Sequence, residues 1–565
     1  MPVLSVSSRP GRLLTCPPHY FSGHRMSSDN MQTLVTTARN LFAQGQVAQA
    51  LAATENLVAQ GGIDLDLLDQ AWRQAALLDD TDFMARVLAS VKKVAPKTRH
   101  WRLTMLQASY HEVRHEWKEK IVALRKAKKQ GADPALVMLH EASARERLLQ
   151  PEKALAVLDR FRGQGDSLDH AQAIRARCFQ QLKETAKAKA LLESWLPDAG
   201  ENVAAVSGRK LLARLHDKTG DWESAWHWAS QGNHLSAKLY KAALGDNDIR
   251  WRVEIWHHLF RADSQFQLPT YDVSKGGSEE MSPVFLLGFP RSGTTLLEQI
   301  LDAHPKITAM EEPPTVTDAL RQAVEMAKAR AWLRGSLKQP GLSKKQALVR
   351  IFQEMSNFSQ GEIRRLRDIY WESARKRLGN FSEPVLLDKM PLNTVDMAFI
   401  NMLFPRARFI VALRHPADVL LSCYMQSFEA NDAMVNFHEM ESAAIFYRQV
   451  MGLLERYQAR LSLEGRMHFI RYEDLTADFD TEAEALMMFL GLPFEPSQQN
   501  YHEHARQRGT LATPSYQGVT QPIYRNAVDR WQNYNQWMGP AFEHLAAACR
   551  CYGYSLELQE RKSRG

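Results

Sequence analysis

The segment Gly288–Thr295, with the sequence Gly-Phe-Pro-Arg-Ser-Gly-Thr-Thr, has the composition of an anion-binding loop. Its two glycines are separated by four residues, as in a Walker loop, whose backbone N–H groups and following helix N-terminus hold phosphates. Thr294 stands where such a loop has the lysine that reaches the β- and γ-phosphates. The loop therefore suits a nucleotide with a short anionic tail, to which Arg291 supplies charge and Ser292 a hydroxyl donor.

A second anion site is predicted at Arg414. This arginine directly follows the apolar run Phe409–Leu413 and precedes a helical segment that contains Ser422. An arginine at the carboxyl end of a buried strand, beside the start of the next helix, is placed for a phosphate at the edge of a sheet. The alternative is that Arg414 forms a surface ion pair.

The elements around these two groups are expected to form a parallel sheet. Short apolar runs of the buried-strand type occur near Val284, Val385, Phe409 and Phe469, and helical patterns separate them. This order predicts an α/β fold of the P-loop kind. The long helical insert from about 316 to 378 is expected to be a lid over the acceptor. Its basic residues could meet an acidic acceptor or form a solvated helix face, and the second interpretation is favoured: Arg364, Arg365 and Arg367.

The segment Pro290–Thr295 resembles the 5′-phosphosulfate loop of the sulfotransferases. Its continuation Leu296–Leu301 is closest to the tyrosylprotein sulfotransferases and to bacterial proteins that fuse tetratricopeptide repeats to such a domain. The resemblance covers about residues 283–535. It implies transfer of a sulfuryl group from 3′-phosphoadenylyl sulfate (PAPS) to a hydroxyl acceptor on a protein tyrosine, a sugar or a lipid, without a metal. The residues that it assigns to PAPS are Arg291, Ser292, Gly293, Thr294, Thr295, Arg414, Ser422, Tyr472, Ser515 and Arg530.

The resemblance also assigns two catalytic residues. Lys389 lies in a segment similar to the family's strand-end lysine motif, which implies a place beside the sulfuryl group. Glu312 stands where the tyrosylprotein sulfotransferases have their general base, with Glu311 before it. Such a transfer depends mostly on positioning and electrostatics, so cations and donors must surround the moving group. Pro314 replaces an arginine that family members use near the acceptor, which puts recognition of an acidic tyrosine peptide in doubt.

The amino-terminal part, from about residue 31 to 240, shows one helical pattern after another with turn residues between. Similar segments can be aligned with steps of 35, 36, 33, 34 and 37 residues on Ala50, Ala85, Ile121, Ala154, Ala188 and Ala225. A period near 34 with a small residue at the helix crossing is typical of stacked helical hairpins. The pattern predicts five or six tetratricopeptide-like repeats, and the alternative is an irregular helical bundle. Such repeats offer a concave surface to a protein partner, a substrate or a second copy in a homodimer.

The expected organisation has four parts: a disordered leader at 1–30, the helical repeats and a joining helix at 31–265, the sulfotransferase domain at 278–545 and a C-terminal tail at 546–565. The net charge of +7 is a mild excess on 565 residues, so nucleic acid is not an expected partner. No apolar run approaches the roughly 18 residues that a spanning helix needs. Five scattered cysteines have neither metal-ligand nor disulfide spacing, which favours a reducing, cytoplasmic location.

Two other functions are compatible with parts of the pattern. A nucleotide or small-molecule kinase can use a similar loop, but the absent loop lysine and the second site at Arg414 count against it. A tetratricopeptide scaffold with an inert sulfotransferase domain is the other alternative. The presence of Arg291, Glu312, Lys389 and Ser422 counts against such decay.

Overall fold

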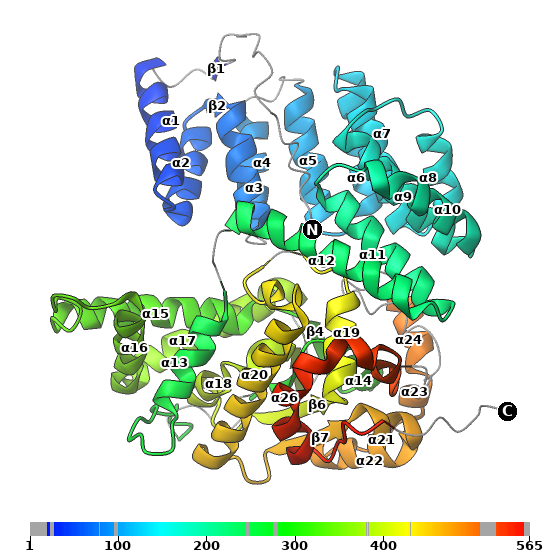
Figure 1. The fold of residues 1–565 in the computed structure, drawn as a ribbon. Helices are drawn as coiled ribbons and strands as arrows, with labels where there is room; N and C mark the ends of the chain where they lie inside the picture. Colours follow the sequence, from blue (N-terminus) through cyan, green and yellow to red (C-terminus); the bar gives the residue numbers. More distant parts are fainter. Residues whose placement is uncertain are drawn as a thin grey trace. The chain divides into compact units, whose positions relative to one another are not determined.

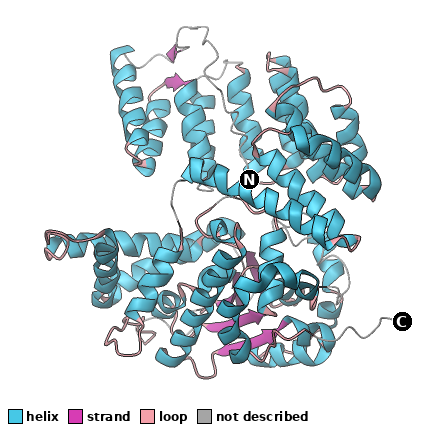
Figure 2. Cartoon of the chain, in the orientation of Figure 1, coloured by secondary structure: helices cyan, strands magenta, loops and turns pink. Residues whose placement is uncertain are grey.

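The computed structural model describes residues 20–22, 28–77, 80–94, 100–244, 248–274, 281–379, 381, 384–429, 431–508 and 527–558. The chain divides into two compact units, Met1–Leu239 and Tyr240–Gly565 (Figure 1). The described part of the first unit is almost entirely helical, whereas the second contains a sheet with helices around it (Figure 2). The division falls inside helix α12 (Trp222–Leu244), near the start of the joining segment that the sequence placed with the repeats.

The described residues of the first unit form consecutive helical hairpins, which follow one another from α1 to α12 (Figure 1). The first and second helices of these hairpins are α1 (Ser28–Ala43) and α2 (Val47–Ala59), α3 (Leu65–Leu77) and α4 (Thr81–Val94), α5 (Trp101–Val113) and α6 (Trp117–Lys129), α7 (Pro134–Arg147) and α8 (Pro151–Leu158), α9 (Asp166–Gln181) and α10 (Thr185–Trp195), and α11 (Val203–Lys218) and α12 (Trp222–Leu244). A short 3₁₀ helix, η1 (Leu196–Asp198), follows α10. Each aligned segment of the sequence thus lies in a second helix.

Two of the aligned positions are wrong by one residue. In each second helix one residue donates its backbone N–H to the carbonyl of the N-cap residue, which defines the structurally equivalent position: Ala50, Met84, Lys120, Ala154, Ala188 and Ala225. Met84 and Lys120 therefore replace Ala85 and Ile121, and the steps become 34, 36, 34, 34 and 37. Met84 and Ala85 are both apolar, and Lys120 is buried beside the buried Ile121, so periodicity alone leaves the register open by one position.

Lys120 occupies a position where the first, fourth, fifth and sixth hairpins have an alanine. Its side chain is 1% exposed, and its Nζ lies 2.7 Å from Oε1 of Glu112 in the preceding helix. The ammonium group also lies 5.6 Å from the ring centroid of Trp117. A buried cation is tolerated when it is paired in this way. The hairpin α5–α6 is therefore packed around an ion pair instead of a small residue.

The expected leader contains some regular structure. Strand β1 (Tyr20–Ser22) pairs antiparallel with β2 (Gly62–Asp64), and α1 already begins at Ser28. The expectation of disorder through residue 30 is therefore wrong for these segments. At the other end, α26 (Asn535–Cys551) runs through the expected limit between residues 545 and 546.

The sheet of the second unit has five parallel strands in the order β4-β5-β3-β6-β7. Their bounds are β3 (Val284–Gly288), β4 (Ile307–Glu311), β5 (Val385–Lys389), β6 (Arg408–Leu413) and β7 (Met467–Arg471). The parallel α/β class predicted from the sequence is confirmed. Strand β4 was not predicted, because it alternates between buried and half-buried residues and lacks a continuous apolar run. Strand β3 lies at the centre, between β5 and β6.

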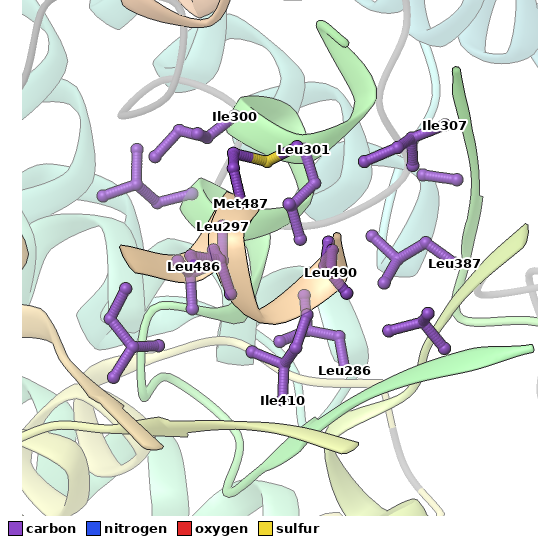
Figure 3. Packing of buried hydrophobic residues seen from close by; sticks show 14 of the residues in the cluster. Leu286, Leu297, Ile300, Leu301, Ile307, Leu387, Ile410, Leu486, Met487 and Leu490 are labelled. Atoms are coloured by element: carbon purple, nitrogen blue, oxygen red, sulfur yellow. The ribbon is translucent and has the colours of Figure 1, made fainter. Parts of the chain in front are cut away.

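Helices cover both faces of this sheet. On one face Leu286 and Ile410 pack against α14 (Thr294–Asp302) and α22 (Phe479–Leu490), as Figure 3 shows. On the other face the ring of Phe285 lies 6.0 Å from those of Tyr370 and Phe404. The remaining elements are α13 (Arg250–Leu259), α15 (Thr315–Leu333), α16 (Lys344–Glu354), η2 (Met355–Asn357), α17 (Gln360–Leu378), η3 (Pro391–Thr394), α18 (Met397–Leu403), α19 (Pro416–Met425), η4 (Met434–Phe437), α20 (Met440–Arg460), α21 (Tyr472–Ala477), α23 (Pro496–Gln499), α24 (Tyr501–Arg508) and η5 (Arg530–Tyr534).

The insert between β4 and β5 consists of α15, α16 and α17. Arg364 and Arg365 of α17 are exposed, as a solvated helix face requires. Arg367 is different, since it is 2% exposed and its guanidinium lies 4.0 Å from the ring of Tyr271 and 4.7 Å from that of Phe404. This arginine is part of the core, and the interpretation of it as solvated is wrong. Within the described residues, no helix has both the length and the apolar character to span a lipid bilayer.

Candidate active site

The candidate residues lie where the parallel strands end. The loop after β3 carries Arg291, Glu312 follows β4, Lys389 is the last residue of β5, Arg414 follows β6 and Tyr472 follows β7. Because the carboxyl ends of parallel strands meet at one edge of a sheet, these side chains converge there. Each of the five strands contributes one of them.

The loop after β3 is tightly constrained by its neighbours. Gly288 has φ +148°, and a Cβ there would lie 2.7 Å from the carbonyl oxygen of Ala412 on β6. Gly293 has φ +102°, and a Cβ there would lie 3.1 Å from the ring of Tyr472. Arg291 adopts φ +72°, which is unusual for a residue with a side chain. The loop thus fits between β6 and α21 only with glycine at these two positions.

The loop leaves polar groups for an anion. Ser292 is 3% exposed, and its Oγ has no hydrogen-bond partner among the described residues. Thr294 and Thr295 are buried at the start of α14, whose N-cap residue Gly293 offers no side-chain cap. A helix N-terminus without a side-chain cap and a buried hydroxyl without a partner suit a phosphate or sulfate oxygen. These residues therefore fit the nucleotide that the sequence predicted.

The two predicted anion-binding sites are in contact with each other. Nε of Arg291 donates a hydrogen bond of 3.0 Å to Oγ of Ser422. Nη1 of Arg414 donates one of 3.3 Å to the carbonyl oxygen of Arg291, and its Nη2 donates one of 2.5 Å to the carbonyl oxygen of Ala527. Nε of Arg414 is buried without a partner in the described part of the chain. An arginine has five donors, so Arg414 keeps capacity for a ligand.

The remaining assigned residues differ in how they relate to this group. The centroid of the Tyr472 ring lies 5.1 Å from the guanidinium of Arg414, so the ring packs against this cation. Arg530 lies in η5, with its guanidinium 6.0 Å from the ring centroid of Tyr534. Element η5 is fixed to α19 by the Trp531 N–H, which donates to Oδ1 of Asp418 at 2.8 Å. Ser515 lies outside the described residues.

Lys389 is the centre of a group of charges. Its side chain is fully buried, and its Nζ lies 3.0 Å from Oε1 of Glu312 and 3.1 Å from Oε2 of Glu298. Burial lowers the pKa of Lys389, but the charges of Glu298, Glu312 and Glu311 outweigh it, so that its pKa lies above the ordinary value. Lys389 therefore carries a positive charge at neutral pH.

The backbone distinguishes Glu312 from Glu311. Glu311 ends β4 in register with Lys389, whereas the N–H of Glu312 donates to the carbonyl oxygen of Lys389 at 2.8 Å. Glu312 adopts φ +46°, which turns the chain out of the sheet toward α15. Its side chain is 42% exposed. Glu312 is thus the carboxylate that both contacts Lys389 and remains open to solvent.

Sequence reasoning missed Glu298. It lies in the apolar run that forms α14, one turn after Thr294, and is fully buried. A charged residue is almost never fully buried without a partner. A carboxylate in the middle of an apolar helical run was therefore the signal that could have pointed to a buried cation.

Two polar residues near the site have structural contacts. Nδ1 of His415 accepts the N–H of Ala417, so its Nε2 carries the proton and donates to the carbonyl oxygen of Ser555 at 2.8 Å. Its ring stacks on Trp531 with centroids 5.0 Å apart. Burial raises the pKa of the Cys423 thiol to about 12. His415 therefore anchors the C-terminal segment, and Cys423 is not a thiolate nucleophile at neutral pH.

Comparison with known proteins shows what the second unit is similar to. Residues 283–496 match the model described as "Sulfotransferase family". The chain is 22% identical over 291 residues to protein-tyrosine sulfotransferase 2 of Gallus gallus, covering 49% of this chain and 70% of that protein. It is 25% identical over 378 residues to an uncharacterized protein of Aquifex aeolicus, covering 65% of this chain but spanning only 45% of that protein's length.

Solved structures of sulfotransferases are also similar to this chain. The sulfotransferase domain of the Synechococcus PCC 7002 olefin synthase is 19% identical, with a TM-score of 0.33, and the match covers 51% of this chain and all of that one. The resemblance noticed in the loop 290–295 is confirmed by the family match and by the tyrosine sulfotransferase relative.

Proposed function

We propose that this chain transfers a sulfuryl group from PAPS to a hydroxyl acceptor, because residues 283–496 match the sulfotransferase-family model and the chain is similar to a protein-tyrosine sulfotransferase. The observation that carries the proposal is the arrangement at the carboxyl edge of the sheet. Cations of the loop and of β6 gather on one side of it, and the pair formed by Lys389 and Glu312 lies on the other. Anion binding and proton removal are the two requirements of sulfuryl transfer.

Several groups of the chain would hold the donor. The α14 N-terminus, the Ser292 hydroxyl and the Arg291 guanidinium suit its 5′-phosphosulfate, and Arg414 with Ser422 suits its 3′-phosphate. Tyr472 packs against both Arg414 and the loop, and so fixes the position of one relative to the other. Thr294, Thr295 and Arg530 remain part of the proposed donor site, as does Ser515.

Two residues would act on the transferred group. As the new bond forms between the acceptor oxygen and sulfur, the bond from sulfur to the bridging phosphate oxygen breaks and the bisphosphate leaves. The acceptor proton goes to the Glu312 carboxylate, which is within reach of solvent. The Lys389 ammonium offsets the negative charge that develops on the bridging oxygen. Among the described residues, no group of three or more His, Cys, Asp or Glu side chains could hold a metal ion.

The acceptor is proposed only as a hydroxyl-bearing molecule. Glu312 lies directly before the Pro313-Pro314 pair and α15, so the insert α15–α17 borders the open side of the base. This position supports its role as the acceptor lid. Protein tyrosine is one candidate acceptor, and a sugar or a lipid hydroxyl is another. We further propose that the tetratricopeptide-like hairpins bind a protein partner, the acceptor or a second copy of the chain.

Donor binding can be tested by thermal stability. Adenosine 3′,5′-bisphosphate should raise the melting temperature, because it binds only the folded state. ATP with magnesium should do so much less, because the loop lacks the lysine for a γ-phosphate. Transfer is then tested with radiolabelled PAPS and a cell extract, followed by identification of the labelled product. Equal stabilisation by both nucleotides, or by neither, would contradict the proposal.

A further inference from the structure

Lys389 is held between two carboxylates with very different surroundings. Glu298 belongs to α14 and is fully buried, whereas Glu312 lies at the turn after β4 with a side chain 42% exposed. Their oxygens are almost equally far from Nζ, at 3.1 and 3.0 Å. The ammonium thus has one counter-ion fixed in the core and one at the open side of the site.

The proposed chemistry makes this asymmetry important. When Glu312 takes the proton of the acceptor hydroxyl, the Glu312 carboxylate becomes neutral. Lys389 then loses one of the two carboxylate charges in contact with its Nζ. A fully buried ammonium without compensation is strongly unfavourable. Glu298 is fully buried and takes no part in that proton transfer, so it retains its charge. It can keep Lys389 protonated throughout the transfer.

We infer that Glu298 is a positioning residue, which holds Lys389 charged and in place while Glu312 changes from ion-pair partner to general base. The inference rests on the proposed function. Glu298 is assigned this role through its contact with Lys389, so its removal should lower the pKa of the lysine and leave nucleotide affinity unchanged.

The charged and titratable groups around Lys389 set the direction of the effect. They are Glu298 from α14, Glu311 and Glu312 at the end of β4, and Asp388 on β5, whose carboxylate accepts bonds from Thr315 and Tyr370. Burial alone lowers the pKa of Lys389, and the carboxylates raise it. Removal of one carboxylate charge should therefore lower this pKa. Because the ammonium is the active form, the alkaline limb of the rate profile should move to lower pH.

The first experiment compares the pH dependence of single-turnover transfer from PAPS in the wild-type protein and in Glu298→Gln. We expect the alkaline limb to shift down by roughly 1–3 pH units, the range caused by loss of an adjacent opposite charge. Affinity for adenosine 3′,5′-bisphosphate should stay unchanged. Glu146→Gln is the control, because Glu146 is a buried partner of Arg177 in the first unit. An unchanged alkaline limb in Glu298→Gln would overturn the inference.

The second experiment does not need turnover and tests the pairing of Glu298 with Lys389 even if Glu298→Gln alone fails to fold. Lys389→Met should destabilise the protein because it leaves Glu298 buried without its cation. Adding Glu298→Gln to Lys389→Met should restore part of the melting temperature. A double variant that is less stable than Lys389→Met would refute the pairing. If the wild-type protein neither binds the bisphosphate nor transfers sulfate, the proposed function fails, and this stability comparison still tests the pairing itself.

Discussion

Substitution of Arg414 by alanine should separate the two ends of the bound nucleotide. The guanidinium is almost fully buried, donates to two backbone carbonyls and keeps a buried Nε without a partner in the described residues. If that remaining capacity serves a 3′-phosphate, the variant loses one or two charge-assisted hydrogen bonds, each worth about 1.5–3 kcal/mol. This corresponds to a loss of affinity of roughly ten- to a hundredfold per bond for adenosine 3′,5′-bisphosphate.

The assay is isothermal titration of two ligands that differ in one phosphate. Adenosine 5′-monophosphate lacks the 3′-phosphate, so Arg414→Ala should weaken its binding far less than that of the bisphosphate. Arg291→Ala should weaken both ligands, because Arg291 lies in the loop and also donates to Ser422. Arg408→Ala is the matched control: this arginine begins β6, at the opposite end from Arg414, and its Nη1 donates to the carbonyl oxygen of Leu490 at 2.6 Å.

One complication follows from the contact between the two arginines. Loss of Arg414 also frees the carbonyl oxygen of Arg291, so the loop itself could loosen. Arg414→Lys keeps the charge but not the fork of donors, and should lie between wild type and Arg414→Ala for the bisphosphate. The reasoning is refuted if Arg414→Ala weakens the two ligands by the same factor, since the 3′-phosphate would then lie elsewhere.

Three further outcomes are expected. Glu312→Gln should lower single-turnover transfer by about 10²–10⁴-fold with unchanged bisphosphate affinity, because it cannot accept a proton, whereas Glu311→Gln should retain near-normal turnover; the reverse result would move the base by one residue. Burial raises the pKa of Asp388 to about 6, so this group stabilises the fold fully below about pH 4 and that contribution is lost as pH rises through 6. The wild-type protein should therefore lose about 3 kcal/mol of unfolding free energy between pH 4 and pH 8 that Asp388→Asn does not lose. Parallel pH curves of the two proteins in denaturant titrations would contradict this. Leu149→Gly should increase the free energy of unfolding by about 1 kcal/mol and so raise the melting temperature, because Leu149 is exposed at φ +55° in a hairpin turn. The equivalent turns of other hairpins have Gly45 and Gly220. A lower melting temperature would show that the turn is not strained.

Much of the sheet could be predicted because parallel strands are buried on both faces and leave continuous apolar runs. Val284–Leu287 and Phe409–Leu413 are such runs, and both were placed within a residue of the observed strands. Strand β4 lies at the edge of the sheet, where a strand needs less apolar surface. Its Ile-Thr-Ala-Met-Glu sequence therefore gave a weaker signal, although it is the strand that positions Glu312.

Local patterns could identify the charged residues of the site but not their partners. Arg291 and Ser422 are 131 residues apart in the chain and are joined by a hydrogen bond only because β3 and β6 are neighbours in the sheet. Sequence reasoning treated the loop and Arg414 as two independent sites, since strand order is not encoded in either motif. Glu298 was overlooked for the same reason, because its partner Lys389 comes from a strand 91 residues later.

The backbone at the site carries a related constraint. Arg291 and Glu312 both have positive φ although they bear side chains, and such residues persist only where neighbouring contacts hold them. Arg414 holds the carbonyl of Arg291, and Lys389 holds both the N–H and the carboxylate of Glu312. Because β3 lies between β5 and β6, the loop has Lys389 on one side and Arg414 on the other. Lys389, proposed to act on the transferred group, and Arg414, proposed to bind the 3′-phosphate, therefore also fix the strained turns. A substitution of either should alter the geometry of the base or the loop as well as the local charge.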